Sequence, residues 1–131
     1  MEKRMDPAEF KNLLETRTRV FATTIFKLLD ALPKKNSTRV IVYQLGKSAS
    51  SIGANYREAN RAESRVDFGH KLQIALKEAN ESVYWLEILT NLYPMHAAFR
   101  ASLQECTELR NLLQSISKSV RRGRNQTIQQ S

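Results

Sequence analysis

The sequence predicts an all-α protein, an antiparallel up-down-up-down four-helix bundle. Apolar residues recur at helical spacing in four segments of similar length, and proline or capping residues separate the segments. No segment shows the alternation of apolar and polar residues that a strand would have. Helices of about 25 residues are about 37 Å long. Short connections between helices of matched length make neighbours antiparallel.

The first helix is expected to begin after Asp6. This residue is a good N-cap, Pro7 suits the first helical position, and Glu9 can complete a capping box. Pro33 then stops the helix. The apolar stripe of this helix consists of Phe10, Leu13, Leu14, Phe21, Ile25, Leu28, Leu29 and Leu32.

A second helix is expected from a cap at Asn36, Ser37 or Thr38 to about Glu63. Its buried face centres on Ile52 and carries small and polar residues where an ordinary core would carry leucines. The neighbours of Ile52 on this face are Leu45, Ser48, Ala49, Asn55, Tyr56 and Ala59. A buried polar side chain without a hydrogen-bond partner costs about 1–3 kcal/mol, so specific partners are expected.

The third helix starts at a second capping box, Ser64 with Asp67, and ends at Tyr93-Pro94. The fourth follows, and the single cysteine, Cys106, lies in register with its apolar stripe, which predicts a buried structural thiol. Residues 1–121 are expected to form the bundle, and residues 122–131, which lack apolar periodicity, a flexible basic tail.

The chain has 131 residues, a net charge of +8 and a pI near 9.9. It shows neither a membrane-spanning apolar run nor a signal segment, so a cytoplasmic protein is expected. The excess positive charge fits a solvated surface or a surface that binds RNA or DNA without sequence preference. The basic residues expected to contact phosphates are Arg39, Lys47, Arg57, Arg61, Arg65, Arg121, Arg122 and Arg124.

Two further groups of residues are predicted on the second helix. A polar seam with the third helix would pair Lys71 with Glu58 and Asn55, and Glu78 with Ser48 or Ser51. A strip of small residues is expected to point away from the core, where a neighbouring subunit or a nucleic-acid backbone could approach closely. This strip consists of Gly46, Ser50, Gly53 and Ala54.

The segments YQLGKSASSIGANYREANRAES and DFGHKLQIALKEANESVYWLEIL resemble the bacterial four-helix-bundle proteins encoded within intervening sequences of 23S ribosomal RNA genes. The pattern Q-L-x-[RK]-[SA]-x-x-S-I-x-A-N-x-x-E-[GA] of that family matches from Gln44 to Ala59. The resemblance implies a small non-enzymatic protein that forms a homo-oligomer, a pentameric ring. Its relatives include the accessory proteins of retroelements, which partner a reverse transcriptase and nucleic acid.

Two other functions are open. The chain could bind a protein such as a reverse transcriptase without contacting nucleic acid. Alternatively, Arg65 and His70 satisfy the R-x4-H spacing of HEPN ribonucleases, in which Arg and His assist attack by a ribose 2′-hydroxyl. The motif is short and arises easily by chance. The sequence predicts no catalytic residue, cofactor site or metal site, since no Glu-x-x-His pair or phosphate-cradling glycine loop is present.

Overall fold

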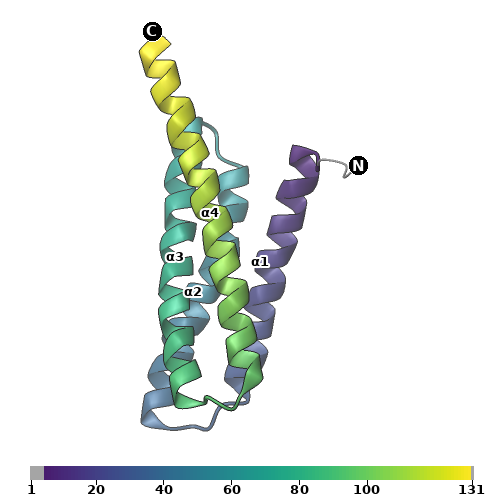
Figure 1. Cartoon of the computed structure of the whole chain (residues 1–131), viewed down its shortest axis with the longest axis vertical. Helices are drawn as coiled ribbons and strands as arrows, with labels where there is room; N and C mark the ends of the chain where they lie inside the picture. The colour runs from purple at the N-terminus through teal and green to yellow at the C-terminus, as the bar shows by residue number, and fades with distance from the viewer. Residues whose placement is uncertain (1–4, 131) are drawn as a thin grey trace.

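Between residues 5 and 130 the chain forms four α-helices, as a computed structural model of the protein shows (Figure 1). The helices are α1 (Pro7–Asp30), α2 (Asn36–Asn60), α3 (Arg65–Leu92) and α4 (Ala97–Gln130). The structure describes the backbone of residues 5–130 and the side chains of residues 5–123. Consecutive helices run in opposite directions, which confirms the predicted all-α bundle. Within this range no helix is long and apolar enough to cross a membrane.

The predicted N-caps of α1 and α3 form, and the predicted cap of α2 does not. The backbone N–H of Ala8 donates to the Asp6 carboxylate at 3.0 Å, and Ser64 Oγ accepts from the N–H of Asp67 at 3.1 Å, as predicted. The start of α2 differs, because it is preceded by Lys35, whose ammonium cannot accept a hydrogen bond. Thr38 Oγ1 instead accepts from the backbone N–H of Lys35 at 2.9 Å.

The core runs the length of the bundle and draws on all four helices. Its largest fully buried side chains are Leu14, Ile25, Leu45, Ile52, Tyr56, Leu72, Leu86, Leu89, Phe99, Leu109 and Leu113. Cys106 is also buried, with Sγ 3.6 Å from the carbonyl oxygen of Ala79, which confirms the predicted structural thiol. Burial raises the pKa of the Cys106 thiol to about 12.

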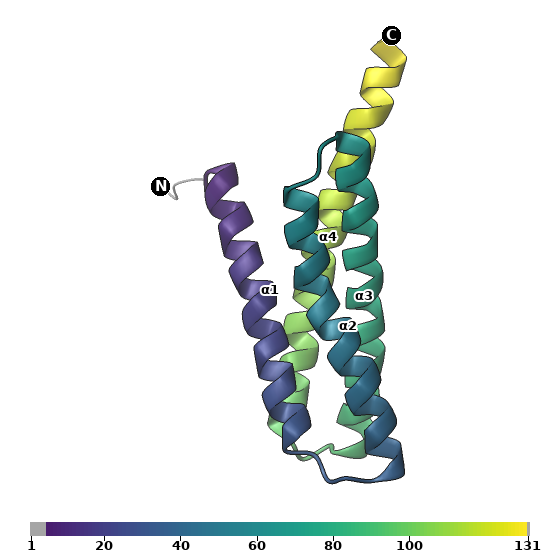
Figure 2. The same cartoon turned by 180° about the vertical axis from the view of Figure 1, so that it is seen from behind.

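The first helix packs mainly on α2 and diverges from the other helices toward its N-terminal end (Figure 2). A charged contact links it to α4: Arg17 Nη2 lies 2.6 Å from Glu105 Oε1 and 2.5 Å from Glu108 Oε2. The hydrogen bond from Arg17 and its charge lower the pKa of Glu105. Arg17 therefore joins α1 to two carboxylates of α4.

The fourth helix is longer than predicted. Its backbone stays helical through Gln130, and its last turns project beyond the ends of the other helices (Figure 1). Good helix formers such as Arg121, Arg122 and Gln126 can continue a helix without apolar periodicity, since helix propensity does not require a buried face. The flexibility of residues 122–131 stays a prediction.

The strip of small residues was expected to point away from the core, and for its glycines this is wrong. Gly46 and Gly53 are buried against α1. A Cβ at Gly53 would lie 2.9 Å from Thr18 Oγ1, and one at Gly46 would lie 3.3 Å from Phe26 Cε1. The glycines thus allow α1 to approach α2 within the same chain. Of the other two members of the strip, Ser50 is half-buried and Ala54 is exposed.

Candidate nucleic-acid interface

The end of α2, the start of α3 and the outward extension of α4 share one end of the bundle (Figure 1), and each of these segments carries arginines. The helix break between them is short, because α2 ends at Asn60 and Ser64 caps α3. The fourth helix passes close to the start of α3: a Cβ at Gly123 would lie 3.5 Å from Arg65 Nη1. Three helices therefore contribute to this surface, the arginine end, made by Arg57, Arg61, Arg65, Arg121 and Arg122.

Two of these arginines are partly neutralised by α1. Arg57 Nε lies 3.2 Å from Glu15 Oε1, and Arg61 Nη1 lies 3.6 Å from the same oxygen. The Nδ2 of Asn60 also donates to Glu15 Oε2 at 3.1 Å. The sequence did not predict these contacts of Glu15, since they depend on the axial position of α1 relative to α2.

The other three arginines remain available to an anion. Arg65, Arg121 and Arg122 are exposed, and none forms an ion pair with any side chain that the structure describes. Like charges at one end of a bundle repel one another unless a counter-charge is supplied. The predicted contact Arg124 lies outside the described side chains.

Two predicted phosphate contacts lie elsewhere on the bundle. Arg39 is on the first turn of α2, about 33 Å from Arg61 at 1.5 Å per residue. Lys47 lies between them and is exposed. The seven predicted residues whose side chains the structure describes therefore do not all lie on one surface.

The Arg65–His70 pair does not converge on one site within a chain. Five residues along a helix turn the side chain by about 140°, so the two groups leave α3 in different directions. His70 instead lines a cavity of about 190 Å³ together with Gln73, Ser117 and Arg121. Gln73 Nε2 donates to Ser117 Oγ in its wall.

The polar seam between α2 and α3 contains one of the predicted pairs. Lys71 Nζ lies 3.3 Å from Glu58 Oε2. Both groups are more than a third exposed, so this pair contributes at most about 1 kcal/mol. Asn55 differs from prediction, because its Nδ2 donates to the backbone oxygen of Ser51 at 2.8 Å within its own helix.

The serines of the seam also find other partners. Ser48 Oγ lies 2.9 Å from Ser82 Oγ in the core, and Ser82 donates to the backbone oxygen of Glu78 at 2.9 Å. Ser51 donates to the backbone oxygen of Lys47 at 2.7 Å. The predicted bond to the Glu78 carboxylate is wrong, because short hydroxyls reach backbone oxygens one turn away more easily. Burial raises the pKa of this carboxyl.

Comparison with known proteins agrees with this fold. A family model described as 23S rRNA-intervening sequence protein matches residues 11–115. A solved structure, a protein of unknown function from the S23 ribosomal protein family of Bacteroides thetaiotaomicron, is 40% identical and has a TM-score of 0.73. The match covers 80% of this chain and 98% of that chain. No curated protein matches the sequence. The chain belongs to the family of 23S rRNA-intervening sequence proteins.

Proposed function

We propose that this protein is a non-enzymatic, cytoplasmic scaffold that binds RNA or DNA weakly, without sequence preference, through the arginine end. One observation carries the proposal: exposed Arg65, Arg121 and Arg122, from two helices, share one end of the bundle without acidic partners among the described side chains. Guanidinium groups bind phosphate oxygens through paired N–H donors. Such contacts fix position on a backbone and carry no sequence information.

Charge reversal with a matched control tests the interface. The triple variant Arg65→Glu, Arg121→Glu and Arg122→Glu removes the three unpaired cations. The control reverses three exposed cations elsewhere and has the same net charge: Arg19→Glu, Lys27→Glu and Lys77→Glu. Affinity for a short structured RNA is measured from 50 to 200 mM salt, where log K falls by about 0.9 per phosphate contact per decade of salt.

The proposal expects the triple variant to bind at least tenfold more weakly than the control at 50 mM salt, with a salt slope smaller by about 2–3. Equal affinity and slope in the two variants would show that only net charge matters. The RNA is expected to remain intact throughout. Cleavage that disappears in His70→Ala would favour the ribonuclease instead.

We further propose that the scaffold is a homo-oligomer. Trp85 supports this, because its Nε1 is buried and has no hydrogen-bond partner among the described residues. A buried donor without an acceptor costs about 1–3 kcal/mol, and docking of a second subunit would offset this cost by turning the half-buried ring so that Nε1 meets an acceptor at the interface. Exposed apolar side chains accompany it on α2 and α3: Val40, Tyr43, Ile74 and Tyr84.

The variant Trp85→Phe tests this contact, since it keeps a large ring and removes the N–H. Light scattering is expected to show a smaller mass than for the wild type at the same concentration, with unchanged helicity. A wild-type protein that is monomeric at all concentrations would contradict the homo-oligomer. In that case the face around Trp85 would be a candidate surface for a different protein, such as a reverse transcriptase.

A further inference from the structure

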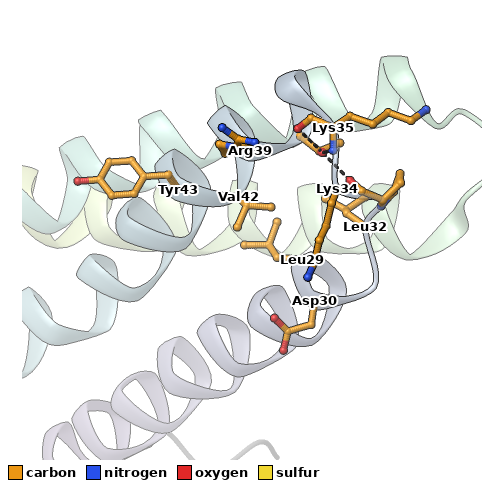
Figure 3. Close-up of a pocket in the computed structure, with 10 residues that line it drawn as sticks. Leu29, Asp30, Leu32, Lys34, Lys35, Arg39, Val42 and Tyr43 are labelled. Carbon is orange, nitrogen blue, oxygen red and sulfur yellow. Dashed lines mark hydrogen bonds between the residues drawn. The ribbon is translucent and has the colours of Figure 1, made fainter.

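A pocket of about 470 Å³ lies at the opposite end of the bundle from the arginine end, between the end of α1 and the start of α2 (Figure 3). Pockets of roughly 300–1,000 Å³ accommodate small ligands. Leu29, Leu32 and Val42 provide apolar lining, and Leu29 and Val42 occupy the middle of the view in Figure 3. The pocket is half open to solvent, and it offers a small molecule an apolar wall.

The charges around this pocket are unbalanced. Lys34, Lys35 and Arg39 line it, and Asp30 is the single acidic residue among the lining side chains. None of these four forms an ion pair with a residue whose side chain is described. Figure 3 shows Lys34 reaching down toward Asp30 while Lys35 extends away from the centre.

The position of these cations is unfavourable for the bundle alone. They flank the start of α2, where the helix carries partial positive charge and acidic residues are usually favoured. The first turn of α2 contains no acidic residue. An anion in the pocket would offset both the cations and the helix end, while its apolar part covered Leu29 and Val42.

We propose that this pocket binds a small organic anion, one carboxylate or phosphate group on an apolar body. Arg39 contacts the anionic group, Lys34 adds charge at the opposite wall, and Leu29 and Val42 contact the apolar body. This site is independent of the arginine end, because about 33 Å of α2 separates Arg39 from Arg61.

Four probes that share one ring system separate the contributions: 2-naphthoate, 2-naphthyl phosphate, 2-naphthalenemethanol and 2-naphthylmethylammonium. Binding is followed by NMR shifts of the Leu29 and Val42 methyl groups in the full chain. At least one anion is expected to bind tenfold more tightly than the ammonium compound. Tighter binding of the phosphate or of the carboxylate identifies the anionic group preferred.

Two variants and a control then locate the anion. Arg39→Glu is expected to weaken binding of the preferred anion at least tenfold, and Lys77→Glu, which changes net charge equally on exposed α3, less than twofold. Val42→Glu places a carboxylate one turn from Arg39 and is expected to abolish binding. Thermal unfolding confirms that these exposed-site variants remain folded.

Three results would overturn the proposal. They are equal affinity for the anionic and ammonium probes, absence of methyl shifts at Leu29 and Val42, and undiminished anion binding in folded Arg39→Glu. Equal affinity for the two kinds of probe would mean that the pocket binds apolar molecules whatever their charge. Either of the other two results would mean that the anion binds elsewhere.

Discussion

Gly53→Ala tests the packing of α1 on α2 most sharply, because the added methyl group has two opposite effects on the free energy of unfolding. Alanine is favoured over glycine within a helix by about 1 kcal/mol. The new Cβ, however, would lie 2.9 Å from Thr18 Oγ1 and 3.1 Å from Thr18 Cβ, well inside ordinary contact distance.

The neighbour at this contact has little freedom to move. Thr18 is completely buried, and its Oγ1 donates to the backbone oxygens of Leu14 and Glu15 at 2.9 and 3.0 Å. Forcing an extra methyl group into a well-packed site costs about 1–3 kcal/mol. The net expectation for Gly53→Ala is therefore a loss of about 1 kcal/mol in the free energy of unfolding.

Two other glycines provide matched controls in the same chain. At Gly69 a Cβ would meet only Val120 Cγ1 at 3.7 Å, so Gly69→Ala is expected to stabilise by about 1 kcal/mol. At Gly46 the nearest atom is 3.3 Å away on Phe26, a residue that is 46% exposed and whose ring can shift. Gly46→Ala should fall between the other two.

Urea unfolding at one protein concentration measures all three variants, because association would otherwise contribute to stability. The expected order of stability is Gly69→Ala, then Gly46→Ala, then Gly53→Ala, with about 2 kcal/mol between the extremes. A Gly53→Ala protein as stable as Gly69→Ala would refute the close approach of α1 to α2. The small residues of α2 would then be free to face a second subunit, as the sequence suggested.

Four more predictions concern individual side chains. The pKa of Glu105 is lowered by its arginine partner, so its contribution to stability is present above the unfolded-state pKa near 4.5 and is lost as pH falls; Glu105→Gln should be less stable than wild type at pH 7. The pKa of Glu78 is raised by burial, so Glu78→Gln should be at least as stable as wild type at pH 7. Cys106, with a pKa of about 12, should react with a thiol reagent at pH 8 only on unfolding. Ser82→Ala removes the hydrogen bond to Ser48, which keeps only its 3.4 Å bond to the backbone oxygen of Leu45, and should cost about 1 kcal/mol, while the double alanine variant should cost less.

Each of these has a contradicting result. Equal unfolding midpoints for Glu105→Gln and Glu78→Gln at pH 7 would contradict the opposite directions of the two pKa shifts, lowered for Glu105 and raised for Glu78. Rapid thiol labelling of the native protein would show that the core opens around Cys106. If the double serine variant were less stable than the single one, the two hydroxyls would not be a coupled pair.

Helix number, order and most boundaries were predictable because they depend on local signals. Asp6 and Ser64 cap the helices they were expected to cap, and α3 ends just before Tyr93-Pro94. The buried face around Ile52 was also predictable, since helical spacing alone places residues on one side of a helix. Only Asn55 on that face is half-buried instead of buried.

Contacts between helices were harder to predict. They depend on how each helix is rotated about its axis and shifted along its neighbour, and local sequence patterns do not determine either. The glycines of α2 indicated a close approach, but a second subunit and α1 of the same chain both satisfied that indication. The neutralisation of Arg57 and Arg61 by Glu15 was missed for the same reason. The pocket near Arg39 was missed because its walls come from two helices and the turn between them.

Light scattering of the purified protein, with and without a short structured RNA, tests the central claim most directly. The account predicts a discrete oligomer that gains the mass of RNA at about 50 mM salt and loses most of it at about 200 mM, because phosphate contacts weaken steeply over this range. An oligomer whose mass is unchanged by RNA at both salt concentrations would contradict it.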